Sequence, residues 1–288
     1  MSAAWVMLVG IALAWGTSFA AMEVALEGAG PLAIMAARLV IGALCVSLAA
    51  LVMRVGRPML SAWWQYLGVA AIGNCIPFFL IPWGQQAVSS SVAGAIMGTM
   101  PLVTAALATA VGIERLARRQ WGGLAVGFVG LLVLAQSQTQ FSGALTGAVA
   151  IFGAVVCYAL STLFARIGPD HNPVRAASAT LTLAGLMGCV AFGVSDEPRP
   201  TLAAGTALTL VYLGVLPTGL AVVLYFKVVK LRGPVFLSQV NYMIPVIALV
   251  IGWWVMRDPV VVALPVGIAL VLAGLGLAGR KPPASSPR

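Results

Sequence analysis

A cluster of polar side chains interrupts an otherwise apolar stretch of the chain near residue 240. Ser238, Gln239, Asn241 and Tyr242 immediately precede Pro245. Amides and hydroxyls are costly in an apolar environment without a hydrogen-bond partner, and a proline inside a helix leaves the carbonyl one turn back unpaired. An amide beside a free carbonyl can bind an ammonium or a carboxylate. The cluster therefore predicts a binding site that uses Gln239, Asn241 and Tyr242, unless these side chains bind neighbouring helices instead.

Two other stretches place polar and aromatic side chains one helical turn apart. Trp15 is followed by Ser18 and Phe19 at helical spacing, and Tyr158 is followed by Ser161 in the same way. An indole could stack on the ring of a substrate, or it could pack against lipid or a neighbouring helix. We assign all five residues to the candidate substrate site.

A third stretch adds an amide and two more rings. Asn74 and Phe78 share one face of a helix, with Phe79 beside them. Met97 lies in a segment of small and flexible residues that leaves room for a ligand. Arg38 is the only clear charge well inside an apolar stretch. It could hold a substrate carboxylate, or it could cap helix-end carbonyls or extend towards a loop.

Prolines in the same stretches mark places where helices could bend. Bending during opening is one interpretation, and static kinks required by packing are the other. The five candidate hinges are Pro77, Pro82, Pro101, Pro217 and Pro245.

The elements that carry these residues must lie in lipid. Of the 288 residues, 61% are hydrophobic and only 8% are charged, against roughly 25% charged in a soluble domain; the mean hydropathy is +1.04. A spanning helix needs about 20 residues. We predict an all-α membrane protein with ten transmembrane helices, at approximately Ala4–Met22, Leu32–Met53, Trp63–Gly84, Val88–Gly112, Gln120–Leu134, Gly143–Arg166, Arg175–Ser195, Leu202–Phe226, Pro234–Met256 and Val260–Gly279.

The charges between these spans predict the orientation. If both termini are cytoplasmic, 13 Lys and Arg residues fall in inner connections and 2 in outer ones. Cytoplasmic loops are rich in Lys and Arg, so the net charge of +9 reports orientation and predicts no nucleic-acid partner. We expect a multi-pass protein of the bacterial inner (plasma) membrane with cytoplasmic N- and C-termini.

The two halves of the chain resemble each other. A shift of 144 residues places Pro101 on Pro245, Gly130 on Gly274 and Glu114 on Asp258. Five spans in each half make the repeats inverted, an architecture typical of transporters. We expect one five-helix repeat over residues 1–138, a second over residues 139–280, and a disordered cytoplasmic tail over residues 281–288.

The whole chain resembles the EamA type of the drug/metabolite transporter superfamily, and within it the YddG-type exporters of aromatic and other amino acids. The resemblance implies a central cavity lined mainly by spans 1–4 and 6–9. It rests on the run from Trp15 to Phe19, on Arg38, on Pro101 followed by Glu114, and on Pro245 followed by Asp258.

The sequence lacks the motifs that would indicate nucleotide hydrolysis, metal binding or catalysis. No Walker motif occurs, and the single histidine, His171, has no Cys or Glu at metal-ligand spacing. No nucleophile and histidine form a catalytic pair in the membrane. We expect no enzyme activity, no metal and no cofactor.

The scarcity of charge inside the spans favours a neutral or zwitterionic substrate. No acidic residue lies at mid-depth, and Arg38 is the only basic one. We expect alternating-access export of aromatic and other neutral amino acids. Efflux of uncharged or cationic toxic metabolites is an alternative, and a sensory or lipid-interacting protein without transport is another. The expected partners are the amino acid and the bilayer, with the choice between a monomer and a weak dimer left open.

Overall fold

The computed structural model describes residues 3–112, 118–136, 143–201, 203–232, 234–237, 240–257 and 262–279, and this part of the chain is helical throughout apart from its connections. In the first half, α1 (Ala3–Leu26) and α2 (Pro31–Val52) are continuous. The third segment joins η1 (Leu60–Ala62), α3 (Trp63–Ala70), η2 (Ala71–Cys75) and α4 (Ile76–Gln85). The half ends with α5 (Ser90–Met97), α6 (Met100–Ala110) and α7 (Arg118–Gln136).

The second half follows the same plan. It contains α8 (Ala144–Ile167) and α9 (Pro173–Gly193), then a segment made of α10 (Ala204–Leu213), η3 (Gly214–Leu220) and α11 (Ala221–Arg232). After these come α12 (Pro234–Leu237), α13 (Val240–Trp254) and α14 (Ala263–Gly279). Within the described residues, seven segments are long and apolar enough to cross a membrane, and three shorter apolar helices add to them. The prediction of ten helical spans is confirmed.

Several predicted boundaries were wrong. The first helix runs on to Leu26 rather than ending at Met22, because the residues after Met22 include only one charge before the turn. The eighth span extends to Arg232 rather than Phe226. The fourth span is not one helix: α5 ends at Met97 and α6 begins at Met100, with Pro101 in its first turn. A proline is tolerated there because the first helical N–H groups have no partner within the helix.

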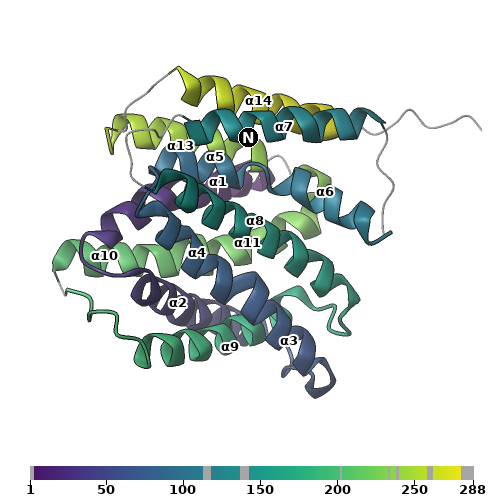
Figure 1. The fold of residues 1–288 in the computed structure, drawn as a ribbon. Coiled ribbons are helices and arrows are strands. Elements are labelled where there is room, and N and C mark those ends of the chain that lie inside the picture. The colour runs from purple at the N-terminus through teal and green to yellow at the C-terminus, as the bar shows by residue number, and fades with distance from the viewer. Residues whose placement is uncertain are drawn as a thin grey trace, which may run out of the picture.

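Helix contacts show the relation between the halves. In Figure 1, α7 lies along α14 at the top and α2 lies along α9 at the bottom. The contact of α4 with α8 has its counterpart in the contact of α1 with α10 and α11, and α5 packs on α13. If each span of the first half is exchanged with the span five positions later, every one of these contacts maps either onto itself or onto another contact of the set. The described segments therefore form two five-helix repeats related by a pseudo-two-fold axis.

Two π-helical turns occupy equivalent places in the two repeats. The segments η2 and η3 are both π-helical, and each lies in the middle of its span. Such bulges are rare and are concentrated at functional sites. Both of them border the cavity described below.

Glycines allow the closest helix contacts. A Cβ at Gly274 would lie 2.5 Å from the backbone oxygen of Gly123 on α7. We expect Gly274→Val to push α14 away from α7 and to destabilise the protein by about 1–3 kcal/mol, as overpacking does elsewhere. Thermal unfolding of the detergent-solubilised variant measures this. Gly276→Val on the same helix is the matched control, because a Cβ there meets nothing within 4 Å.

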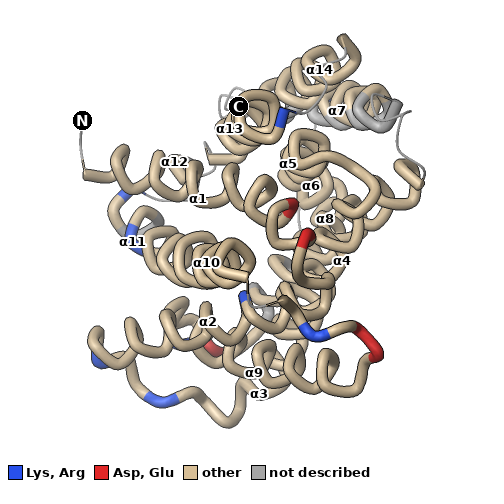
Figure 2. Tube along the Cα trace, turned by 90° about the vertical axis from the view of Figure 1, so that its left-hand side faces the viewer, with Lys and Arg blue, Asp and Glu red and all other residues tan. Residues whose placement is uncertain are grey.

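The two ends of the bundle differ in charge (Figure 2). One end carries residues 53–59 and 168–172, and we name it the Asp170 end. The opposite end carries residues 27–30 and 194–201, and we name it the Glu23 end. Most of the described Lys and Arg residues lie towards the Asp170 end, whereas most of the described acidic residues lie towards the Glu23 end.

Candidate functional site

A cavity of about 750 Å³ lies between the two halves. Residues from α1, α2, η2 and α4 line one side of it, and residues from α8, η3, α11 and α13 line the other. The structure thus brings together residues that are far apart in the sequence. The predicted site residues on its wall are Trp15, Ser18, Phe19, Arg38, Asn74, Phe78, Met97, Tyr158, Pro217 and Asn241.

Other predicted residues are not on the cavity wall. Ser161 is buried against η2, where a Cβ on Gly73 would lie 2.1 Å from its hydroxyl oxygen. Phe79 packs against the apolar cluster around Leu39 and Leu181. Gln239 and the side chain of Tyr242 lie outside the described part of the structure. The prolines outside the lining are Pro77, Pro82, Pro101 and Pro245.

Arg38 is 6% exposed and reaches the cavity from α2. Its Nη1 donates to the sulfur of Met22 at 3.1 Å, and its Nε and Nη2 both lie 3.4 Å from the hydroxyl oxygen of Thr218. The guanidinium carbon lies 4.3 Å from the centre of the Phe78 ring. Within the described residues, no carboxylate lies within ion-pair distance of this side chain. A buried cation with only neutral contacts is costly, and strongly perturbed charged groups are concentrated at functional sites.

The indole of Trp15 is anchored across the cavity. Its Nε1 donates to the carbonyl oxygen of Pro217 at 2.9 Å, and its ring centre lies 6.2 Å from that of Tyr225. Pro217 lies inside η3, and a π-helical turn with a proline leaves backbone carbonyls without their usual partners. The polar edge of the indole is therefore occupied by the protein itself.

Asn74 and Thr218 occupy equivalent positions in the two π-helical turns. Asn74 Nδ2 donates to the carbonyl of Val69 at 3.0 Å, and Thr218 Oγ1 donates to the carbonyl of Leu213 at 2.7 Å. In both cases the acceptor lies five residues earlier in the chain. Because a carbonyl can only accept, the Asn74 nitrogen must face Val69. Asn74 lines the cavity, and its side-chain oxygen accepts no hydrogen bond from the described residues.

Close contacts block the Glu23 end of the cavity. Gln85 Nε2 donates to the carbonyl of Phe19 at 2.9 Å. The carboxylate of Glu197 accepts from the N–H groups of Leu32 and Ala33 at 3.0 and 2.8 Å, at the start of α2. A buried apolar cluster packs in the same part of the bundle, and Met22, Ile34, Val88 and Val92 belong to it.

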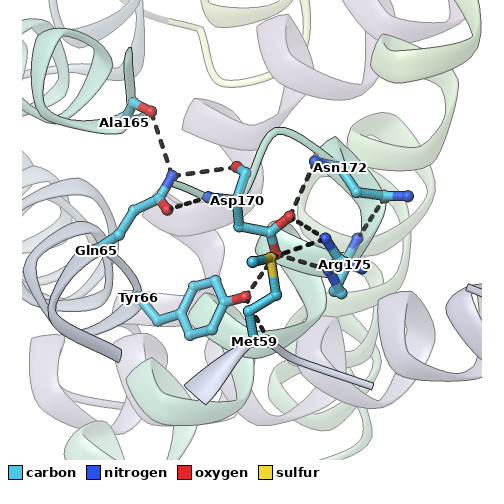
Figure 3. Close-up of polar contacts among 7 residues, drawn as sticks. All are labelled: Met59, Gln65, Tyr66, Ala165, Asp170, Asn172 and Arg175. Carbon is cyan, nitrogen blue, oxygen red and sulfur yellow. Dashed lines mark hydrogen bonds and ion pairs between the residues drawn. The ribbon is translucent and has the colours of Figure 1, made fainter. Parts of the chain in front are cut away.

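The cavity instead extends towards the Asp170 end, where a polar cluster links α3 to the α8–α9 connection (Figure 3). Asp170 accepts from Arg175 at 2.6 and 2.8 Å, from the hydroxyl of Tyr66, and from the N–H of Asn172 at 2.9 Å. Gln65 exchanges hydrogen bonds with the backbone of Asp170. Burial alone would raise the pKa of Asp170, but the bonds from Arg175 and Tyr66 lower it to about 2. The carboxylate is therefore ionised at neutral pH.

Sequence reasoning missed several wall residues. Met22 and Met100 carry no signal beyond apolar character, whereas Tyr225, with its ring and hydroxyl, and Thr218 could have been found. The shift of 144 residues that aligns Pro101 with Pro245 also places Asn74 on Thr218.

Comparison with known proteins agrees with this architecture. The model of the EamA-like transporter family matches the chain twice, over residues 2–136 and 145–280. The chain belongs to the EamA-like transporter family. It is accordingly a multi-pass membrane transporter and not an enzyme.

Relatives of this EamA-like transporter match it over most of their own length. A probable terminal-alkyne amino-acid exporter of Streptantibioticus cattleyicolor is 28% identical over 97% of the chain and 94% of its own length. The uncharacterized transporter YdfC of Bacillus subtilis is 26% identical, covering 89% of the chain and 85% of that protein. The inner membrane transporter YedA of Escherichia coli K12 is 24% identical, covering 83% and 78%. One crystal structure superposes with a TM-score of 0.69 over 96% of both chains at 20% identity, which is a likeness of fold.

Proposed function

We propose that this EamA-like transporter exports amino acids with aromatic or other uncharged side chains. The observation that carries the proposal is the position of Arg38. Its guanidinium reaches a cavity of about 750 Å³ and has only neutral contacts among the described residues. A carboxylate is the group that matches a guanidinium in both charge and geometry.

The rest of the wall fits the other parts of an amino acid. The side-chain oxygen of Asn74 can accept from the ammonium group, and the amide of Asn241 lies on the same wall. The ring face of Trp15 with Phe19 and Met97 offers an apolar surface to the side chain. Gln239 and Tyr242 stay in the proposed site on the sequence argument alone. The amino-acid exporter among the relatives supports this substrate class.

The state of the cavity fits an exporter. The excess of Lys and Arg in the connections of the Asp170 end makes that end cytoplasmic under the positive-inside rule, with both termini on the same side. The cavity extends towards this end and is blocked at the Glu23 end. An inner-membrane carrier in this state is open to cytoplasmic amino acids. Exchange of conformations between the two repeats would then open the Glu23 end.

Flux through reconstituted liposomes tests the proposal. We expect labelled phenylalanine or leucine to cross in the presence of the protein, and absence of flux for every amino acid tried would refute the proposal. Trp15→Ala should reduce flux about 10-fold or more, because a large anchored aromatic contact is lost. Trp253→Ala is the matched control, since Trp253 is 59% exposed on the outside of α13. Equal losses in both variants would remove Trp15 from the site.

A further inference from the structure

We infer that the cavity recognises the carboxylate of its substrate and does not require the ammonium. It should therefore also take monocarboxylates with an apolar side chain but no free amino group, such as 2-hydroxy, 2-oxo and N-acylated acids. It should reject the matching amines. The inference rests on the proposed function, because it deepens the substrate class of the same site.

The charges on the cavity wall support this selectivity. Among the described lining residues, Arg38, Asp170 and His171 are the only Asp, Glu, Lys, Arg or His side chains. Both oxygens of Asp170 already accept hydrogen bonds, from Arg175, Tyr66 and Asn172. Asp170 and Arg175 therefore neutralise each other. Arg38 is left as the cation of the described wall that lacks a counter-ion.

The present contacts of Arg38 are replaceable. Two of its nitrogens lie 3.4 Å from one hydroxyl oxygen, that of Thr218, and the third nitrogen contacts the sulfur of Met22. The Phe78 ring lies 4.3 Å from the guanidinium carbon and covers one face of it, which leaves the N–H edges free to change partners. Thioether sulfur is a weak acceptor, and 3.4 Å is long for a hydrogen bond. A carboxylate can bind a guanidinium through two short, parallel, charge-assisted bonds. The ligand therefore offers Arg38 better partners than the protein does.

Among the described lining residues, the ammonium finds no comparable partner. Its available acceptors are neutral oxygens, such as the side-chain oxygen of Asn74, whose nitrogen is held by Val69. In a medium of low dielectric constant, uncompensated charge is costly. The net charge of Arg38 together with its ligand therefore depends on the head group. It is zero with a monocarboxylate, +1 with a zwitterionic amino acid and +2 with an amine.

Competition assays on the unmodified protein test the inference without any substitution. Liposomes containing the transporter take up labelled phenylalanine at pH 7.5 in the presence of unlabelled phenylalanine, phenyllactate, N-acetylphenylalanine or phenethylamine. These compounds share one ring and differ in the head group. Protein-free liposomes correct for passive leakage. We expect both acids to compete within about 5-fold of phenylalanine, and phenethylamine to be at least about 100-fold weaker, which corresponds to about 2.8 kcal/mol.

The outcomes separate the two proposals. If phenylalanine is transported but neither acid competes, or if phenethylamine competes as well as phenylalanine, the inference is wrong and amino-acid export stands. If phenylalanine and the other amino acids are not transported, the proposed function fails. Binding is then measured directly, by thermal shift of the detergent-solubilised protein with phenyllactate and phenethylamine. Stabilisation by the acid and not by the amine supports carboxylate recognition, and the reverse order overturns it.

Discussion

Replacement of Arg38 by glutamine is expected to reduce amino-acid flux at least about 100-fold. The guanidinium is buried, faces the cavity and has only neutral partners in the described structure. Truncating one partner of a buried charge pair typically costs about 2–5 kcal/mol of binding. Glutamine keeps a polar side chain of similar reach but removes the charge. Flux of labelled phenylalanine as a function of its concentration measures the effect, which should be a weaker apparent affinity.

Two further variants make the Arg38 result specific. Arg38→Lys keeps the charge but cannot form the two-pronged contact with a carboxylate, so its flux should lie between those of the unmodified protein and Arg38→Gln. Arg199→Gln is the matched control, because Arg199 is exposed at the Glu23 end. If Arg38→Gln remains folded and transports phenylalanine at the unmodified rate, Arg38 does not bind the carboxylate.

Asp170→Ala is expected to destabilise the protein by about 2–4 kcal/mol. Asp170 is only 4% exposed, and its carboxylate accepts hydrogen bonds from Arg175, Tyr66 and Asn172. Removing one member of a buried ion pair is strongly destabilising, although Arg175 keeps 22% side-chain exposure and regains some solvation. Thermal unfolding in detergent measures the loss. Asp196→Ala is the control, since Asp196 is exposed in the connection after α9.

The pH dependence of stability gives an independent check on Asp170. Its folded-state pKa is lowered to about 2 by Arg175 and Tyr66 against the opposing effect of burial, whereas an unfolded aspartate titrates near about 3.9. The stabilisation of the folded state by the ionised Asp170 carboxylate is therefore complete above pH about 4 and is lost as the pH falls towards 2. The unmodified protein should lose stability over that window more steeply than Asp170→Ala. Equal slopes would mean that Asp170 contributes nothing through its charge.

Much of the fold could be predicted from the sequence because lipid imposes simple rules on composition. Apolar length identified the spans, and the match of Pro101 with Pro245 identified the repeat. The breaks within spans could not be located as well. The interruption between Met97 and Met100, and the π-helical turn around Gly73 and Asn74, depend on which neighbouring side chains satisfy the backbone.

The cavity could be predicted only in part. Trp15, Arg38, Asn74 and Phe78 stood out because polar or aromatic groups at mid-span are unusual, and all four line the wall. Ser161 shared that signal but is covered by Gly73 of a neighbouring helix. A periodicity places a side chain on a helix face, whereas the packing partner decides whether that face reaches a cavity.

The cluster around Asp170 could not be predicted at all. Tyr66 is 104 residues away in the sequence, and neither residue lies in a recognisable motif. Such contacts follow from the docking of one repeat on the other, which a single sequence does not encode as a local pattern.

The unequal partners at equivalent positions of the two repeats have a thermodynamic consequence. If the repeats were identical, the empty carrier would have the same free energy in both orientations and would populate them equally. Two differences between the repeats break this equality. Asn74 in the first repeat corresponds to Thr218 in the second, and the cap that Glu197 makes at the start of α2 corresponds to the Asp170–Arg175 ion pair at the start of α9. Each difference of about 1.4 kcal/mol shifts the resting ratio tenfold. Differences of this kind between the repeats therefore bias which of the two orientations the empty carrier prefers, independently of any substrate that it binds.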